Sequence, residues 1–259
     1  MDPWYPAIVL VFRDERAVNR FLCIQNRQSG AAATEFIIIF PALIFLLFGI
    51  IQWGLIYQAR ATLNYATLLA ARAGAVQNGS KAEMRKGLAA GLTPLFATEA
   101  SISGVTAARA KAFAEISILN LAQIEVLNPT SKSMSDFGRP KLDGTAGTEL
   151  PNDTLTYRNP SPGANSGISV QDANILHVRI TYCYRMIVPV VGRMIEAVSH
   201  TLTPFDKSLQ ANGMSDPFGI GSPLIIDALC TRPFANGPRI RIESEAVVRM
   251  QSPFDKKNL

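Results

Sequence analysis

The chain has 259 residues, which is enough for one sizeable domain or two small ones. Apolar residues make up 48% and charged residues only 17%, and many of the apolar residues fall in one uninterrupted block. The net charge of +5 comes without any cluster of about five to eight Lys and Arg residues, so a nucleic-acid-binding function is not supported.

The uninterrupted block runs from Phe36 to Tyr57, with no charge and one clearly polar side chain, Gln52. A bilayer core of about 30 Å is spanned by about 20 apolar residues in a helix. A buried helix of a soluble protein is the alternative, but such a helix usually keeps a polar stripe. The block therefore predicts one transmembrane helix, with the aromatic rings of Trp53 and Tyr57 near the headgroups at its C-terminal end.

Three residues inside this predicted span affect how the helix packs. Pro41 lacks an N–H, so the carbonyl of Ile37 loses its helical partner and a mild kink is expected. Gly49 and Gly54 would let another backbone come close, although their spacing is not GxxxG.

The residues just before the span, NRQSGAAATEF, combine a positive charge at Arg27, a Gly at position 30 followed by small residues, and Glu35. Taken alone, Glu35 fits an ordinary first-turn acid favoured by the partial charges of a helix N-terminus. Together, a Gly, four residues, a Glu and about twenty apolar residues resemble the prepilin peptidase site of the type IV pilin superfamily. The resemblance implies cleavage between Gly30 and Ala31. The new amine of Ala31 and the carboxylate of Glu35, four residues apart, would then be neighbours on one helix face.

Residues 30–76 as a whole resemble the N-terminal signature of the TadE-like family, which are pseudopilins of the tight-adherence (Tad, or Flp) pilus assembly system. The matching residues are Gly30, Glu35, Phe36, Pro41, Gly49, Gly54, Ala70, Ala71, Arg72 and Ala73. Gln52 stands where the family often has Glu, so a role that depends on charge is not expected there.

The resemblance implies a minor pilin-like component that helps assemble an adhesive pilus or a related secretion apparatus at the bacterial inner membrane. Its implied partners are membrane lipid, prepilin peptidase, other pilus-assembly membrane proteins and pilins. It also implies a cytoplasmic N-terminus and a periplasmic body, whereas the basic residues on the two sides of the span are too evenly matched to set the orientation. The expected domains are a leader (1–30), a transmembrane and spine helix (31–77) and an extracytoplasmic domain (78–259).

Cysteine usage agrees with export. Cys23 falls in the leader, which leaves Cys183 and Cys230 in the mature chain. In an oxidising compartment these two would form a disulfide, and the alternative is two unrelated buried thiols. A CxxC motif is absent from the sequence, so a thioredoxin-type site or a zinc ribbon is not supported.

The remaining patterns indicate an α+β body in which a long helix carries a small antiparallel sheet. Helices are predicted at 58–76, 81–97 and 107–115, with a break at Asn78-Gly79-Ser80 and a bend or end near Pro94. Strands are predicted at 122–127, 175–184 and 239–250, because these segments alternate or are rich in β-branched residues. Residues 128–167 and 199–223 are predicted as loops and 190–198 as a short helix.

Catalytic motifs are absent from the sequence, which contains only two histidines, His177 and His200. The acids of the 128–167 loop do not follow the EF-hand spacing. We therefore expect a protein that is not an enzyme and that has no cofactor and no metal site. The alternative to a pilus component is a membrane-tethered extracytoplasmic binding or sensory domain, in which Gly30 and Glu35 would be coincidental.

Overall fold

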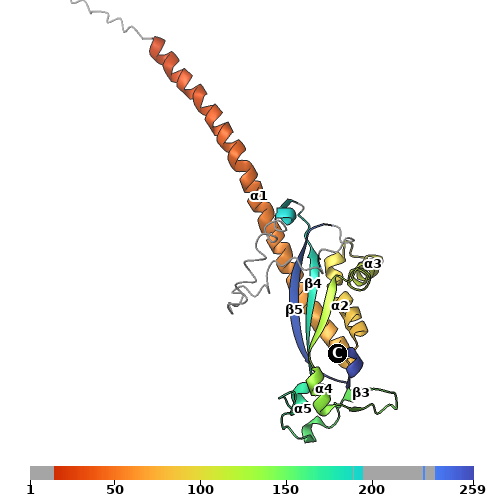
Figure 1. The fold of residues 1–259 in the computed structure, drawn as a ribbon. Coiled ribbons are helices and arrows are strands. Elements are labelled where there is room, and N and C mark those ends of the chain that lie inside the picture. The colour runs from red at the N-terminus through yellow and green to blue at the C-terminus, as the bar shows by residue number, and fades with distance from the viewer. Residues whose placement is uncertain (1–14, 189, 195–229, 231–236) are drawn as a thin grey trace, which may run out of the picture. The chain divides into compact units, whose positions relative to one another are not determined.

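The computed structural model describes residues 15–188, 190–194, 230 and 237–259, with side chains from residue 33 onward (Figure 1). Its contacts divide the chain into two units, Met1–Ile50 and Ile51–Leu259. The second unit combines helices with antiparallel sheet, so the predicted α+β class is confirmed.

The first element is the helix α1, which runs from Glu15 to Val76 over 62 residues and contains Pro41. It includes the predicted span and the predicted spine helix as one element. From Ile51 onward it belongs to the second unit, where its small side chains are buried. The buried part of α1 is the segment expected as the spine helix, and the expected domain boundary at residue 77 stays a prediction.

Small residues bring the helix α2 (Lys81–Phe96) close to α1. Ala59, Ala66 and Ala70 of α1 are fully buried. A Cβ atom added to Gly91 of α2 would lie only 2.4 Å from the Cα of Ala66. The helix runs through Pro94 and ends at Phe96, so the predicted segment and its end near Pro94 are confirmed.

The break between α1 and α2 is a turn held by the C-terminal segment of the chain. Asn78 and Gly79 both have positive φ, 54° and 75°, which only a few residue types adopt readily. The amide of Asn78 donates to Ser252 Oγ at 2.8 Å, and its carbonyl accepts from the amide of Asp255 at 3.1 Å. The C-terminal segment therefore hydrogen-bonds to the turn at the C-terminal end of α1.

The helix α3 (Ile102–Phe113) is followed directly by a π-helical turn, Ala114–Ile118. The prediction placed this helix at 107–115, five residues too late at its start. The side chain of Ser101 accepts from the amide of Gly104 and caps the first turn, and this capping signal was missed in the sequence.

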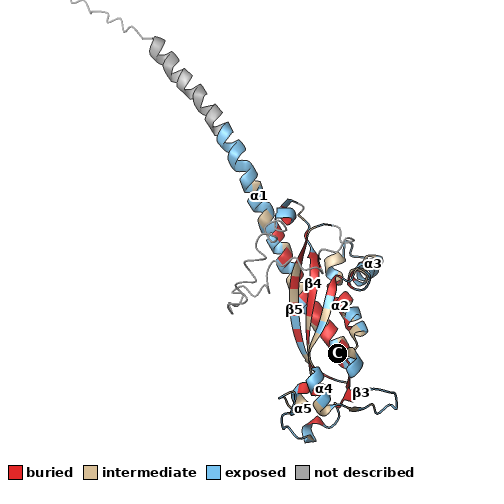
Figure 2. Cartoon of the chain, viewed as in Figure 1, coloured by how far each residue is buried: buried red, intermediate tan, exposed pale blue. Residues whose placement is uncertain are grey.

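The main sheet consists of β1 (Ala122–Asn128), β4 (Ile175–Arg185) and β5 (Arg239–Arg249), antiparallel and in the order β1-β4-β5. Leu176, Val178 and Ile180 of β4 are fully buried and belong to the same core cluster as the alanines of α1. Figure 2 shows this continuous buried layer in the sheet and in the α1 segment that it covers. All three predicted strands are confirmed.

Residues 128–167, predicted as a loop, contain several short elements: α4 (Ser131–Phe137), β2 (Arg139–Pro140), β3 (Thr148–Leu150) and a 3₁₀ turn (Leu155–Tyr157). The helix α5 (Val170–Ala173) follows. A second sheet, in the order β2-β3-β6, joins this region to β6 (Phe254–Asp255). Elements this short, paired with a strand about 100 residues away, leave no periodic signal in the sequence. Of the predicted short helix 190–198, residues 190–194 are helical and the rest lie outside the described residues, as does the predicted loop 199–223.

Candidate membrane anchor and features of the folded body

The predicted span exposes its apolar side chains. Between 38% and 76% of each of the following side chains is exposed: Phe36, Ile37, Ile38, Ile39, Phe40, Leu43, Phe45, Leu46, Leu47, Phe48, Ile50 and Ile51. Within the described residues, one helical segment, Ala33–Val76, is long and apolar enough to cross a membrane, and none of its most apolar window is buried. The core helix of a soluble protein would bury such a surface. The arrangement therefore supports single-pass membrane anchoring.

The predicted processing junction lies within α1. Gly30 and Ala31 fall in the helical part whose side chains are outside the described residues, and Glu35 is exposed at the start of the apolar stretch. The structure therefore places Gly30, Ala31 and Glu35 along one helix, without testing cleavage between the first two.

The packing residues of the span lie on an open helix surface. Pro41 is exposed, and Cβ atoms added to Gly49 and Gly54 would meet nothing within 4 Å in this single chain. Neither glycine is therefore needed for packing within the described part of one chain. The expectation that they receive a neighbouring helix stays a prediction.

Gln52, the polar residue of the span, is fully buried against the body. Its Oε1 accepts a hydrogen bond from the amide of Val188 at 3.0 Å, and its Nε2 has no partner among the described residues. The side chain therefore ties the chain segment that follows β4 to α1.

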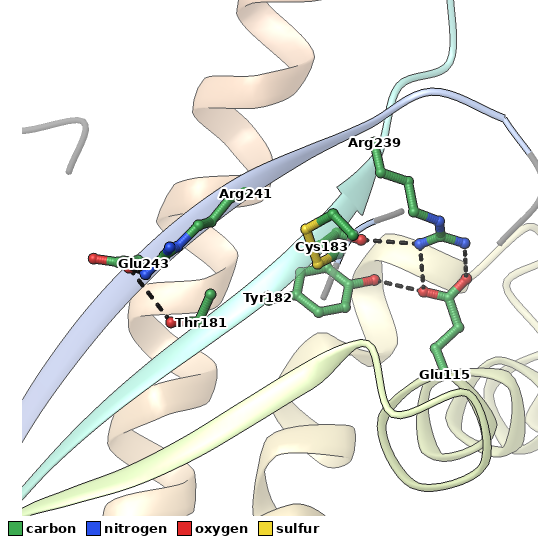
Figure 3. The surroundings of a disulfide bond; sticks show 8 residues. Glu115, Thr181, Tyr182, Cys183, Arg239, Arg241 and Glu243 are labelled. Atoms are coloured by element: carbon green, nitrogen blue, oxygen red, sulfur yellow. Dashed lines mark hydrogen bonds and ion pairs between the residues drawn. A yellow bond between two sulfur atoms is a disulfide. The ribbon is translucent and has the colours of Figure 1, made fainter. Parts of the chain in front are cut away.

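Cys183 of β4 and Cys230 form a disulfide with a Cα–Cα distance of 5.4 Å (Figure 3). Cys183 is fully buried and packs with Leu121 and Cys230 in a small cluster of its own. The bond ties residue 230 to the middle strand of the main sheet. Such bonds persist in oxidising compartments.

A buried ion pair lies beside the disulfide (Figure 3). The guanidinium of Arg239 lies 3.3 Å from Glu115 Oε1 and donates to the carbonyl of Cys183 at 2.9 Å. The hydroxyl of Tyr182 donates to Glu115 Oε2 at 2.8 Å. Burial, with the negative charge of Glu115 beside it, raises the pKa of the Tyr182 phenol, so the ring stays neutral and acts as a donor. Each of the three side chains thus has a partner within the cluster, whereas the buried Nε of Arg239 has none among the described residues.

The face of the main sheet away from Leu176, Val178 and Ile180 carries charged side chains in register. Glu245 of β5 accepts from Arg179 Nε at 2.7 Å and lies 2.8 Å from His177 Nε2. The hydrogen bond from Arg179 holds the pKa of Glu245 below its usual range. His177 thus lies on a strand face within the predicted strand 175–184, whereas His200 lies outside the described residues. Among the described residues, we find no group of three His, Cys, Asp or Glu side chains that could hold a metal ion.

Sequence reasoning missed two parts of this arrangement. The Glu115–Arg239–Tyr182 cluster joins residues from three separate elements, which no local motif connects. The contact between Gln52 and Val188 was likewise invisible, although a lone polar residue in an apolar stretch was a signal that it needs a partner.

The comparisons with known proteins bear on the anchor. A search of curated proteins and a search of solved structures each found no match. The model of the family described as "TadE-like protein" matches residues 30–72, which contain the predicted span and most of the spine half of α1. Residues 30–72 of the chain are therefore similar to the TadE-like family, and the rest of the chain lies outside this match.

Proposed function

We propose that this protein is a pilin-like membrane component that assists assembly of an adhesive Tad/Flp-type pilus or a related secretion apparatus. It acts by helix packing and protein–protein contacts and carries out no catalysis. Its partners are prepilin peptidase, other pilus-assembly membrane proteins and pilins, together with the lipid of the bacterial inner membrane.

One observation carries the proposal. The TadE-like match begins at residue 30, which is the glycine that precedes the predicted cleavage point. Glu35 follows five residues later, at the start of an apolar helix whose side chains are exposed. The start of the family match, the processing pattern and the start of the exposed apolar helix thus lie close together in the sequence, within about two helical turns.

The body is assigned to the periplasm and the leader to the cytoplasm. The Cys183–Cys230 disulfide supports this topology, because structural disulfides are rare in the reducing cytosol and common in the bacterial periplasm. The even distribution of Arg around the span does not oppose it.

Cleavage after Gly30 would give Ala31 a charged amine. Bringing a charge toward the middle of a bilayer costs at least about 2.5 kcal/mol. Pairing of this amine with the carboxylate of Glu35, within one subunit or between neighbours, would offset part of the cost. The pair therefore places a polar contact at the cytoplasmic end of an otherwise apolar helix. This contact would set the axial register of the helix relative to neighbouring helices, which we call the register role.

N-terminal sequencing of the membrane-bound protein tests the proposal. We expect Ala31 as the first residue in cells that contain prepilin peptidase and an intact leader in cells that lack it. Gly30→Val should keep the leader in both, whereas Gly49→Ala, a matched glycine change away from the junction, should be processed normally. An intact leader on functional wild-type protein would exclude the pilin-like function and favour the tethered binding or sensory domain.

A further inference from the structure

The chain that follows β4 returns to α1 at a position inside the apolar stretch. The amide of Val188 donates to Gln52 Oε1 at 3.0 Å. Gln52 lies five residues before Tyr57, the last residue of the uninterrupted apolar stretch, and at 1.5 Å per residue this is about 7.5 Å along the helix. The segment therefore meets α1 at the depth of the predicted membrane interface rather than beyond it.

The segment is held in place by backbone contacts. The amide of Met186 donates to the carbonyl of Pro238 at 2.9 Å, and the amide of Gly192 donates to the carbonyl of Val188 at 2.8 Å. A Cβ atom added to Gly192 would lie 2.9 Å from Pro238 Cγ, so the absence of a side chain permits this approach. We call residues 186–188 and 190–194 the membrane-proximal turn.

The membrane-proximal turn presents apolar side chains outward while burying others. Met186 and Val191 are 3% and 5% exposed, whereas Ile187 and Val190 are 64% and 59% exposed. Trp53, which follows Gln52 on α1, is 59% exposed as well. The exposed apolar surface of α1 thus continues onto a second element at the same depth.

Basic side chains accompany this apolar surface. Arg185 directly precedes the turn and Arg193 lies within it, and both are exposed. Arg185 also lines a cavity of about 760 Å³ together with Lys111, Leu55 and Ile187. Apolar residues next to Arg and Lys suit the boundary of a bilayer, where acyl chains meet anionic headgroups.

We propose that the membrane-proximal turn is a second membrane contact, which inserts Ile187 and Val190 into the interface of the leaflet on the side of the folded body. The inference rests on the proposed membrane anchoring by α1. Its occupant is lipid, because the turn is hydrogen-bonded to a residue of the apolar stretch itself. Two contacts at separate points restrict the rotation and tilt of the body, which a single helix leaves free.

Tryptophan fluorescence of the full chain in lipid vesicles tests this proposal. The chain has two tryptophans, Trp4 and Trp53, so a Trp4→Phe/Trp53→Phe background leaves a single reporter at each introduced site. Val190→Trp is compared with Val247→Trp on β5, because both valines are 59% exposed. Lipids brominated near the glycerol backbone quench a tryptophan at the interface, and aqueous acrylamide quenches one in water.

We expect the tryptophan at position 190 to be quenched several-fold more strongly by brominated lipid, and several-fold less by acrylamide, than the tryptophan at position 247. Equal behaviour of the two reporters would overturn the second contact. Trp53 in the Trp4→Phe background provides the calibration. If brominated lipid fails to quench Trp53, then the membrane anchor itself is wrong; if it quenches Trp53 but not the reporter at position 190, only the second contact fails.

Discussion

Arg239 and Glu115 form a two-pronged ion pair between β5 and the π-helical turn, with Nη2–Oε1 and Nη1–Oε2 distances of 3.3 and 3.4 Å (Figure 3). The Arg239 side chain is only 4% exposed and that of Glu115 is 18% exposed. The pair therefore joins the edge strand of the main sheet to the helical layer, next to the disulfide. Its hydrogen bonds to Tyr182 and to the carbonyl of Cys183 satisfy further polar groups of the cluster.

Removing the acid of this pair is expected to destabilise the body. Glu115→Ala leaves the guanidinium of Arg239 buried without its counter-charge, and breaking a buried pair in this way costs about 3–5 kcal/mol in the free energy of unfolding. Tyr182→Phe, which removes one hydrogen bond to the same carboxylate, should cost about 1 kcal/mol. Urea unfolding of the full chain in detergent micelles, followed by circular dichroism, measures both.

The matched control is Glu83→Ala. Glu83 pairs with Lys86 at 2.7 Å on the exposed surface of α2, where an ion pair contributes at most about 1 kcal/mol. A loss for Glu115→Ala no larger than that for Glu83→Ala would show that the cluster does not stabilise the body.

The disulfide makes a second, separable contribution to stability. Cys183 and Cys230 are 47 positions apart, and the chain-entropy model gives roughly 4 kcal/mol for closing a loop of that length. We expect Cys183→Ala/Cys230→Ala to lower the unfolding free energy by about this amount. Reductant should bring the wild type down to the same value and leave the double variant unchanged. Cys23→Ala, a cysteine change in the predicted leader, serves as the control, and an effect of reductant on the double variant would contradict the assignment.

A close approach of two helices underlies a third prediction. A Cβ atom at position 91 would lie 2.4 Å from Ala66 Cα and 2.6 Å from Ala66 Cβ. Gly91→Ala therefore forces α2 away from α1, and overpacking of this kind costs about 1–3 kcal/mol. The cost opposes the gain of up to about 1 kcal/mol that Ala normally brings to a helix interior.

Gly54→Ala is the matched control for this helix contact, because nothing lies within 4 Å of a Cβ atom added there. It should not lower the midpoint of thermal unfolding, and Gly91→Ala should lower it. If Gly91→Ala, like Gly54→Ala, did not lower the midpoint of thermal unfolding, the tight packing of α2 against α1 would be wrong.

The sequence was informative where one physical signal dominated a long segment. The apolar run from Phe36 to Tyr57 is unmistakable because a bilayer demands length and the absence of charge. The β-branched and aromatic residues of 175–184 predicted the strand β4, and Leu176, Val178 and Ile180, which point to one face of it, are buried. The turn after α1 was predicted from Asn78-Gly79-Ser80, and Asn78 and Gly79 have the positive φ angles that Asn and Gly adopt readily.

The parts that escaped prediction depend on contacts between distant residues. The second sheet forms only because β3 pairs with β6 at the C-terminus, and a strand of two or three residues has no period of its own. The start of α3 was missed because its cap, Ser101, stands among several other small polar residues. The pairing of Glu115 with Arg239 joins positions 124 residues apart, a relationship that only the fold creates.

Glu35 provides the most direct functional prediction. The carboxylate is exposed at the start of the apolar helix, so its removal leaves no buried charge within the described chain. Glu35→Ala should therefore leave membrane insertion unchanged, because the apolar residues that follow drive it. Pilus assembly should fall strongly, because the Ala31 amine loses the partner that offsets its transfer toward lipid.

Membrane fractionation combined with quantification of sheared pili measures the two effects of Glu35→Ala separately. Glu35→Asp keeps the charge on a side chain shorter by one methylene and should retain part of the assembly. Glu83→Ala, an acid-to-alanine change on the surface of the body, should assemble normally. Normal pili in the Glu35→Ala strain would refute the register role of this residue. Loss of the protein from the membrane fraction would instead show that Glu35 acts in insertion, which its position before the apolar stretch does not require.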